Sequence, residues 1–180
     1  METLDFIKDR ELKSTLEGSV EYLYVLYEQS KDKEQKELFS EETRRVMILY
    51  VVSVIEAILL YVYKRQDGVI EKNEYKFVKP LPETFSHSKK KECPVVVAVQ
   101  EKVEKKDHEI GLHELVRFFK SKGLMREDTM SDILEMNDVR NTFHFSKPRR
   151  NSCSINRVEK AMQLLVYTIE RAPKALKVRS

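Results

Sequence analysis

The feature that most constrains the fold is an apolar segment, residues 46–63, that contains a single charged residue, Glu56. A segment that is apolar on nearly every side of a helix indicates either a helix buried all round or a membrane span. This segment is near the lower length limit for a span, and an ionised Glu56 is costly in lipid. The sequence therefore favours a central bundle helix or a helix at a dimer interface. Membrane association is the less favoured alternative.

The chain ahead of this segment is predicted to form a second, amphipathic helix. Apolar residues recur at three- and four-residue steps over residues 3–32, with charged residues between them. Gly18 lies inside this range and indicates a break or a close packing contact. Ser40 precedes Glu41 and Glu42, so we expect its hydroxyl to cap the start of the central helix.

The C-terminal half shows the same periodicity, which predicts three further helices over residues 110–122, 129–143 and 155–173. Gly123 is expected to end the first of them. Ser152 or Ser154 is expected to cap the last, and Pro173 is expected to stop or kink it.

The region between the second and third helices, residues 68–108, has a different composition. β-branched and aromatic runs bounded by turn residues predict a small β-hairpin or extended insertion around residues 69–104. Pro80 and Pro82 are expected to lie in the loop between its two halves, because proline cannot donate to a strand ladder.

These elements predict a mainly α fold, a bundle of four to five helices with one β-rich insertion. Only 4 of the 180 residues are glycine and 5 are proline, too few for a turn-rich all-β protein. The length suits one domain, so we expect residues 1–180 to form a single helical domain with an excursion at about 68–108.

The two cysteines, Cys93 and Cys153, are far apart and belong to no Cys-x-x-Cys pair. Neither a disulfide framework nor a zinc site is expected, and no pattern calls for another cofactor. The residues after Met1 do not resemble a signal peptide. Together these features favour a cytoplasmic protein.

Charge is unevenly distributed along the chain. Residues 1–42 carry 12 acidic and 6 basic side chains, whereas residues 143–180 carry 9 basic and 2 acidic ones. A basic end of this kind indicates an anionic partner such as nucleic acid, or else a solvated helix face followed by a basic tail.

The segment that can carry chemistry is Asn137–His144. Arg140 and His144 are four residues apart and would share one face of a helix, with Asn141 at its edge. An arginine can stabilise charge on phosphate oxygens, and a histidine can move a proton near neutral pH. The alternative is structural, in which these side chains cap a helix end and Arg140 pairs with Glu56.

Arg-Asn-x-x-His at a helix end, followed by a basic loop and a last apolar helix, resembles the signature of HEPN domains. Members are small helical bundles, many of them metal-independent endoribonucleases in toxin–antitoxin and antiviral systems, and several dimerise so that two motifs share one cleft. The acidic residue within the apolar helix, Glu56, is similar to one found in such domains.

The resemblance implies the following roles: Arg140, Asn141 and His144 catalytic, Glu56 and Asp138 supporting, and Lys147, Arg149 and Arg150 contacting RNA. It also implies a homodimer, with RNA and a protein antitoxin or other protein as partners. Three residues separate Arg140 from His144, a shorter spacing than is commonest in the family. Two alternatives follow, an endoribonuclease and a non-catalytic module that dimerises and binds RNA or a protein.

Overall fold

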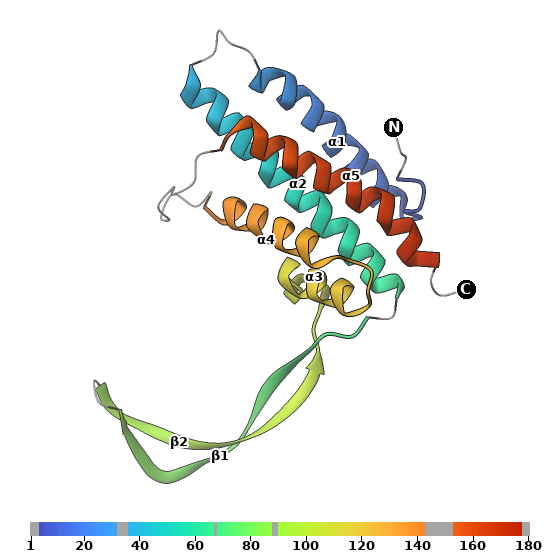
Figure 1. Cartoon of the computed structure of the whole chain (residues 1–180). Helices are drawn as coiled ribbons and strands as arrows, with labels where there is room; N and C mark the ends of the chain where they lie inside the picture. The colour runs from blue at the N-terminus through green and yellow to red at the C-terminus, as the bar shows by residue number, and fades with distance from the viewer. Residues whose placement is uncertain (1–3, 32–35, 67, 88–89, 143–152, 178–180) are drawn as a thin grey trace. The chain divides into compact units, whose positions relative to one another are not determined.

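The computed structural model describes residues 4–31, 36–66, 68–87, 90–142 and 153–177. Within these ranges the chain forms five α-helices, one short 3₁₀ helix and a two-stranded antiparallel sheet (Figure 1). It divides into two compact units, a helical unit of residues 1–68 and 111–180 and a hairpin unit of residues 69–110. The predicted class, a mainly α bundle with a β-hairpin insertion, is confirmed.

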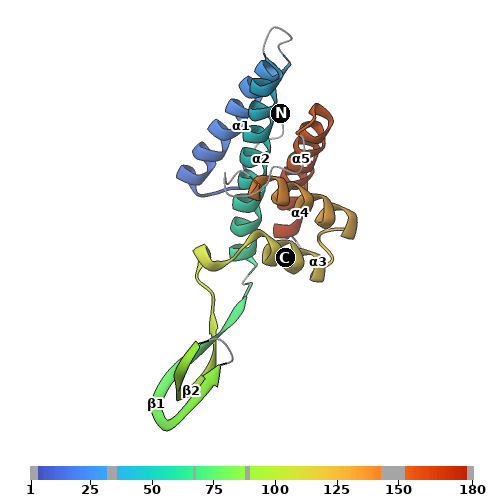
Figure 2. The same ribbon diagram turned by 90° about the vertical axis from the view of Figure 1, so that its left-hand side faces the viewer.

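The helical unit is built around its second helix. Its helices are α1 (Arg10–Ser30), α2 (Glu37–Arg65), α3 (Leu112–Ser121), α4 (Glu127–Asn141) and α5 (Ile155–Lys177). The other four helices all contact α2, and Figure 2 shows α2 between α1 and α5. Packing of several helices on one shared apolar helix is typical of a helical bundle.

The apolar segment of α2 supplies most of the core. Met47, Ile48, Val51, Val52 and Ile58 are completely buried. Burying each such side chain contributes roughly 1.5–3 kcal/mol relative to leaving it exposed. The prediction of a central bundle helix is therefore confirmed.

Length and composition alone also allow α2 to cross a membrane. Of the described helices it is the one that is long and apolar enough, and 61% of its most apolar stretch is buried. The core helix of a soluble protein passes the same test, so the preference against membrane association stays a prediction.

The first helix begins later than its periodicity predicts. Asp9 caps α1, because its carboxylate accepts two N–H groups of the first turn. Leu4 and Ile7 are buried ahead of the helix, where the Tyr61 hydroxyl of α2 bonds the neighbouring backbone. Their apolar character reflects burial in the tertiary structure and not helical periodicity.

Two expectations about the first two helices are wrong. Gly18 neither breaks α1 nor makes a close contact, since an added Cβ would meet no atom within 4 Å. Ser40 does not cap α2. That helix begins at Glu37, where the carbonyl of Lys36 already accepts the N–H groups of Phe39 and Ser40. Ser40 is buried inside the helix.

The ends of α3 and α4 follow the sequence more closely. Gly123, expected to end α3, has φ 68° and donates its N–H to the Lys120 carbonyl. Glycine adopts this left-handed conformation without the penalty a Cβ brings. The start of α4 is Glu127, two residues before the predicted Thr129, and Thr129 instead hydrogen-bonds the Asp128 carboxylate.

The last helix begins where predicted but passes its proline. The Ser154 hydroxyl accepts the N–H of Arg157, so Ser154 serves as the expected cap. Pro173 lies inside α5 without stopping it. The final turn is held against α2 because the Gln66 side chain donates to the Ala175 carbonyl.

The hairpin unit contains β1 (Glu71–His87), β2 (Lys90–Glu104) and the 3₁₀ helix Asp107–Glu109. The strands pair from Glu71↔Glu104 to His87↔Lys90, with three irregularities in register. The predicted loop around Pro80 and Pro82 is wrong, because both prolines lie within β1. Two of the irregularities begin or end at residues 79–84, and bulges and edge strands are where a strand tolerates proline.

Candidate functional site

The candidate site centres on an ion pair between α2 and α4. Nη1 of Arg140 donates to Oε2 of Glu56 at 2.7 Å. The pairing, expected if the two helices pack together, compensates the single charge within the apolar segment. It also fixes the last turn of α4 against the middle of α2.

The pair is only partly buried. The side chains of Arg140 and Glu56 are 31% and 26% exposed, respectively. A guanidinium carries five N–H donors, and the described residues accept one hydrogen bond from Arg140. The group is therefore held in place while keeping donors available for an anion, and a phosphate oxygen is the kind of acceptor it suits.

The polar neighbours of Arg140 lie at the end of α4. Asn141 is the last residue of the helix and is exposed, as is Asp138 one turn earlier. The Thr142 hydroxyl donates to the Val139 carbonyl at 2.7 Å and closes the helix. Asn141 is thus available to a ligand, whereas nothing in the described contacts links Asp138 to Arg140.

The remaining predicted residues of this region lie outside the described part of the chain. These residues are His144, Lys147, Arg149, Arg150 and Ser152. Their roles stay predictions from the sequence.

Glu56 belongs to a half-buried face of α2, which we call the α2 stripe. Its members recur at three- and four-residue steps, and they are Val46, Leu49, Tyr50, Ser53, Glu56, Ala57 and Leu60. At one edge Tyr50 packs edge-to-face on Tyr22 of α1, and at the other Glu56 reaches Arg140 of α4. The α2 stripe is therefore an accessible, mostly apolar surface next to the candidate site.

A second polar cluster joins the beginning of α2 to the residues that precede α5. The Arg44 side chain donates to the Cys153 carbonyl at 2.6 Å, and the Glu41 carboxylate accepts the Cys153 N–H at 3.3 Å. Arg45, 5% exposed, donates to the same carboxylate at 2.8 Å. Hydrogen bonds from Arg45 and from the Cys153 backbone lower the pKa of Glu41.

Sequence reasoning missed this cluster, although the four-residue spacing of Glu41 and Arg45 signals an ion pair on a helix. Its effect is to anchor Cys153, just as the Glu56 pair anchors the end of α4. Burial raises the pKa of the Cys153 thiol to about 11, against the opposing influence of the nearby guanidinium groups. The thiol is consequently a poor nucleophile near neutral pH.

Metal ligands do not gather in the described part of the chain, where no group of three or more His, Cys, Asp or Glu side chains is arranged to hold an ion. The clearest candidate for chemistry among the described residues is therefore the Arg140–Glu56 pair with Asn141 beside it. Comparison of the chain with models of protein families, with curated proteins and with solved structures found no match.

Proposed function

We propose that this protein is a HEPN-like, metal-independent endoribonuclease that acts in the cytoplasm, of the kind found in toxin–antitoxin and defence systems. The observation that supports it is the state of Arg140. Its guanidinium is fixed by Glu56, about one-third exposed and left with donors to spare. A positioned cation of this type can stabilise charge that develops on a phosphate in the transition state.

In the proposed reaction the ribose 2′-oxygen attacks the adjacent phosphorus, and the bond from phosphorus to the 5′-oxygen breaks. The products are a 2′,3′-cyclic phosphate and a 5′-hydroxyl. His144 takes the proton of the 2′-hydroxyl or supplies one to the leaving oxygen. Arg140 binds the non-bridging oxygens, Asn141 orients the phosphate, and Glu56 acts by holding Arg140.

The proposal includes a homodimer that brings two copies of the site together. The α2 stripe supports it, because this apolar surface borders the Arg140–Glu56 pair. Burying such a surface between two copies would remove apolar area from water. Lys147, Arg149 and Arg150 would then extend the cationic track along which RNA lies.

The decisive experiment is cleavage of a mixed RNA pool in excess EDTA by the wild type and by Arg140→Ala and His144→Ala. We expect the wild type to leave 2′,3′-cyclic phosphate ends and each substitution to reduce the rate by at least about a hundredfold. Arg126→Ala is the matched control, since Arg126 lies at the opposite end of α4 and is 74% exposed. Circular dichroism of every variant checks folding.

Absence of cleavage by the wild type, or equal cleavage by all four proteins, contradicts the nuclease proposal. Sedimentation of the same samples tests the dimer. We expect Leu49→Glu with Ala57→Glu to give monomers, whereas Val25→Glu, on the exposed side of α1, leaves the dimer intact. A wild type that sediments as a monomer at every concentration contradicts the dimer alone.

The second candidate is a non-catalytic helical module that dimerises and binds RNA or a protein. The observation that favours it is the same ion pair, because a guanidinium that compensates Glu56 already has a structural role. Under this alternative Arg140→Ala lowers stability, and RNA binds without being cut. A filter-binding assay beside the cleavage assay separates the two candidates.

A further inference from the structure

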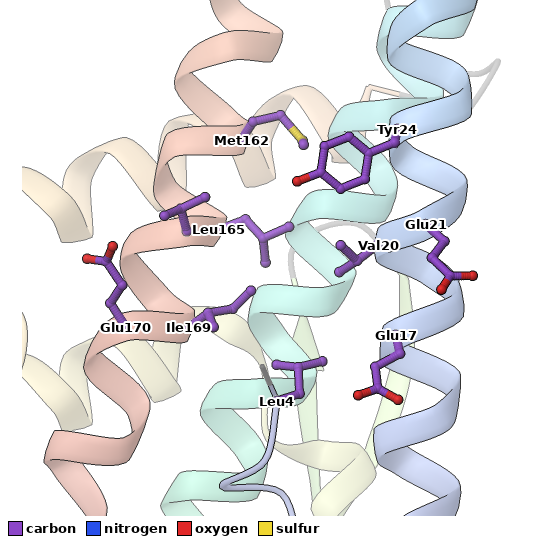
Figure 3. Close-up of a pocket in the computed structure, with 10 residues that line it drawn as sticks. Leu4, Glu17, Val20, Glu21, Tyr24, Met162, Leu165, Ile169 and Glu170 are labelled. Carbon is purple, nitrogen blue, oxygen red and sulfur yellow. The ribbon is translucent and has the colours of Figure 1, made fainter. Parts of the chain in front are cut away.

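A groove on the helical unit is lined by none of the residues assigned to catalysis. It has a volume of about 520 Å³ and lies between α1 and α5, both of which pack on α2 (Figure 3). Its apolar walls are formed by Val20 and Tyr24 of α1 and by Met162, Leu165, Val166 and Ile169 of α5. We call it the α1–α5 groove.

The two walls have the spacing of helix faces. Met162, Leu165 and Ile169 follow one another at three- and four-residue steps, which makes a stripe of two turns, about 10 Å long. Val166 and Tyr24 are 52% and 50% exposed despite their size. The groove thus presents apolar surface to solvent over a length that suits two turns of another helix.

The charged residues of the groove are all acidic. Glu17 and Glu21 project from α1 and Glu170 from α5 (Figure 3), and no lysine or arginine contributes to the lining. Glu17 has one ion pair, to Lys13 at 3.7 Å. Glu21 and Glu170 form no ion pair with any residue that the structure describes. The carboxylates therefore leave a negative rim on both sides of an apolar floor.

We propose that the α1–α5 groove binds an amphipathic helix of a partner protein whose apolar stripe is flanked by lysine or arginine. A helix satisfies its own backbone hydrogen bonds, whereas an extended peptide would leave backbone groups without partners against the apolar walls. Basic flanks complement the carboxylates of Glu17, Glu21 and Glu170, which favours association.

The same charges argue against other occupants. Pairing this groove with its own copy across a two-fold axis would bring the three carboxylates against three more, which is unfavourable. An anionic membrane surface would be repelled for the same reason. The inference does not depend on the nuclease proposal, since none of the groove residues belongs to the Arg140 site.

The probe is a synthetic helical peptide of about 18 residues with leucines in one stripe and lysines on both flanks. A second peptide has glutamates in place of the lysines, and a third carries a central proline that breaks the helix. Fluorescence anisotropy with the full chain measures binding. We expect the lysine peptide to bind, the proline peptide to bind at least about tenfold more weakly, and the glutamate peptide not to bind.

Charge-reversed variants locate the binding surface. Glu21→Lys with Glu170→Lys should weaken binding of the lysine peptide by at least about tenfold and should allow the glutamate peptide to bind. The control, Glu11→Lys with Glu127→Lys, makes the same change in net charge at exposed positions outside the groove. It should bind the lysine peptide like the wild type.

Three results would overturn the proposal. The first is no binding of the lysine peptide up to about 1 mM. The second is an equal loss of lysine-peptide affinity in the groove variant and the control variant, which would indicate general electrostatic attraction and not binding in this groove. The third is a wild-type dimer in sedimentation that the Glu21 and Glu170 substitutions dissociate, which would make a second copy the occupant.

Discussion

The ion pair between Glu56 and Arg140 stabilises the fold and also positions the guanidinium to which we assign a chemical role. A carboxylate within an apolar helix is unfavourable unless a partner compensates it. Here the partner comes from α4, 84 residues along the chain, and the bond is 2.7 Å long. Because both groups are about one-third exposed or less, their interaction is stronger than that of a surface pair and weaker than that of a fully buried one.

Glu56→Gln should lower the free energy of unfolding by about 1 kcal/mol, because it leaves the partly buried guanidinium without a countercharge. Urea denaturation measures the change. Glu135→Gln is the matched control, since Glu135 pairs with Arg157 and Lys160 and is 47% exposed. It should change stability by less than about 0.5 kcal/mol. Equal effects of the two substitutions would contradict the role assigned to Glu56.

The glycines of α1 and α3 lead to opposite predictions. Gly18→Ala should stabilise the protein by about 0.5–1 kcal/mol, because alanine restricts the unfolded chain and nothing obstructs its Cβ. Gly123→Ala should destabilise it by about 1 kcal/mol, since φ 68° is strained for any residue with a Cβ. Thermal unfolding measures the change in melting temperature, which should rise for Gly18→Ala and fall for Gly123→Ala. Changes of the same sign in both variants would contradict these predictions.

At the scale of elements, the base of the hairpin is held by an ion pair between β1 and the 3₁₀ helix that follows β2. The Lys72 ammonium binds the Glu109 carboxylate, which also accepts the Lys106 N–H at 2.9 Å. These two contacts, of which the one to Lys72 has the larger effect, lower the pKa of Glu109 from 4.5 to about 2. Because the pKa is lowered in the folded state, the interaction contributes fully to folding stability above pH 4.5. This contribution is lost as the pH falls through about 2.

Titration of the Glu109 carboxyl by NMR should therefore give a midpoint near 2 in the wild type. Lys72→Ala should move the midpoint upward, toward the ordinary value. Lys76→Ala should leave it unchanged, because Lys76 pairs with Glu101. A wild-type midpoint at the ordinary value would show that the ion pair does not form in solution.

Element bounds depended on contacts that periodicity cannot reveal. The apolar spacing of Leu4 and Ile7 extends the pattern of α1, yet the helix begins after Asp9 and the residues before it are held by the Tyr61 hydroxyl, which hydrogen-bonds their backbone. The prolines of β1 suggested a loop, yet irregular register lets the strand continue past them. Local patterns identified the five described α-helices and the hairpin but not the 3₁₀ helix, and tertiary packing moved the ends of the predicted elements.

At the scale of the whole molecule, the helical unit and the hairpin unit are separate compact units. The two strands meet at the base of the hairpin, where Glu71 opposes Glu104 and the Lys105 N–H bonds the Ile70 carbonyl at 2.8 Å. The two ends of the hairpin unit thus lie next to each other, an arrangement that tolerates deletion or insertion.

Replacing residues 71–104 with a short Gly-Ser linker should leave the helical unit folded. Circular dichroism should show the helical signal retained, and the melting temperature should change by only a few degrees, because the buried hydrophobic residues include none of those that the structure describes between 71 and 104. A single sharp transition checks that unfolding is cooperative, and cooling checks that it is reversible. Loss of the helical signal would show that the hairpin is needed to complete the core.

The sequence by itself determined the central helix, the helical class, the hairpin insertion and the Arg140–Asn141 candidate, because hydrophobic periodicity and turn chemistry are local properties. The tertiary structure decided in favour of the Glu56–Arg140 pair, which the sequence raised as one alternative, and it alone showed that Glu41 and Arg44 anchor Cys153 and that α1 and α5 enclose an apolar groove with an acidic rim. Each of these features joins residues far apart in the chain. Their relation depends on how the helices pack, and no local pattern records it.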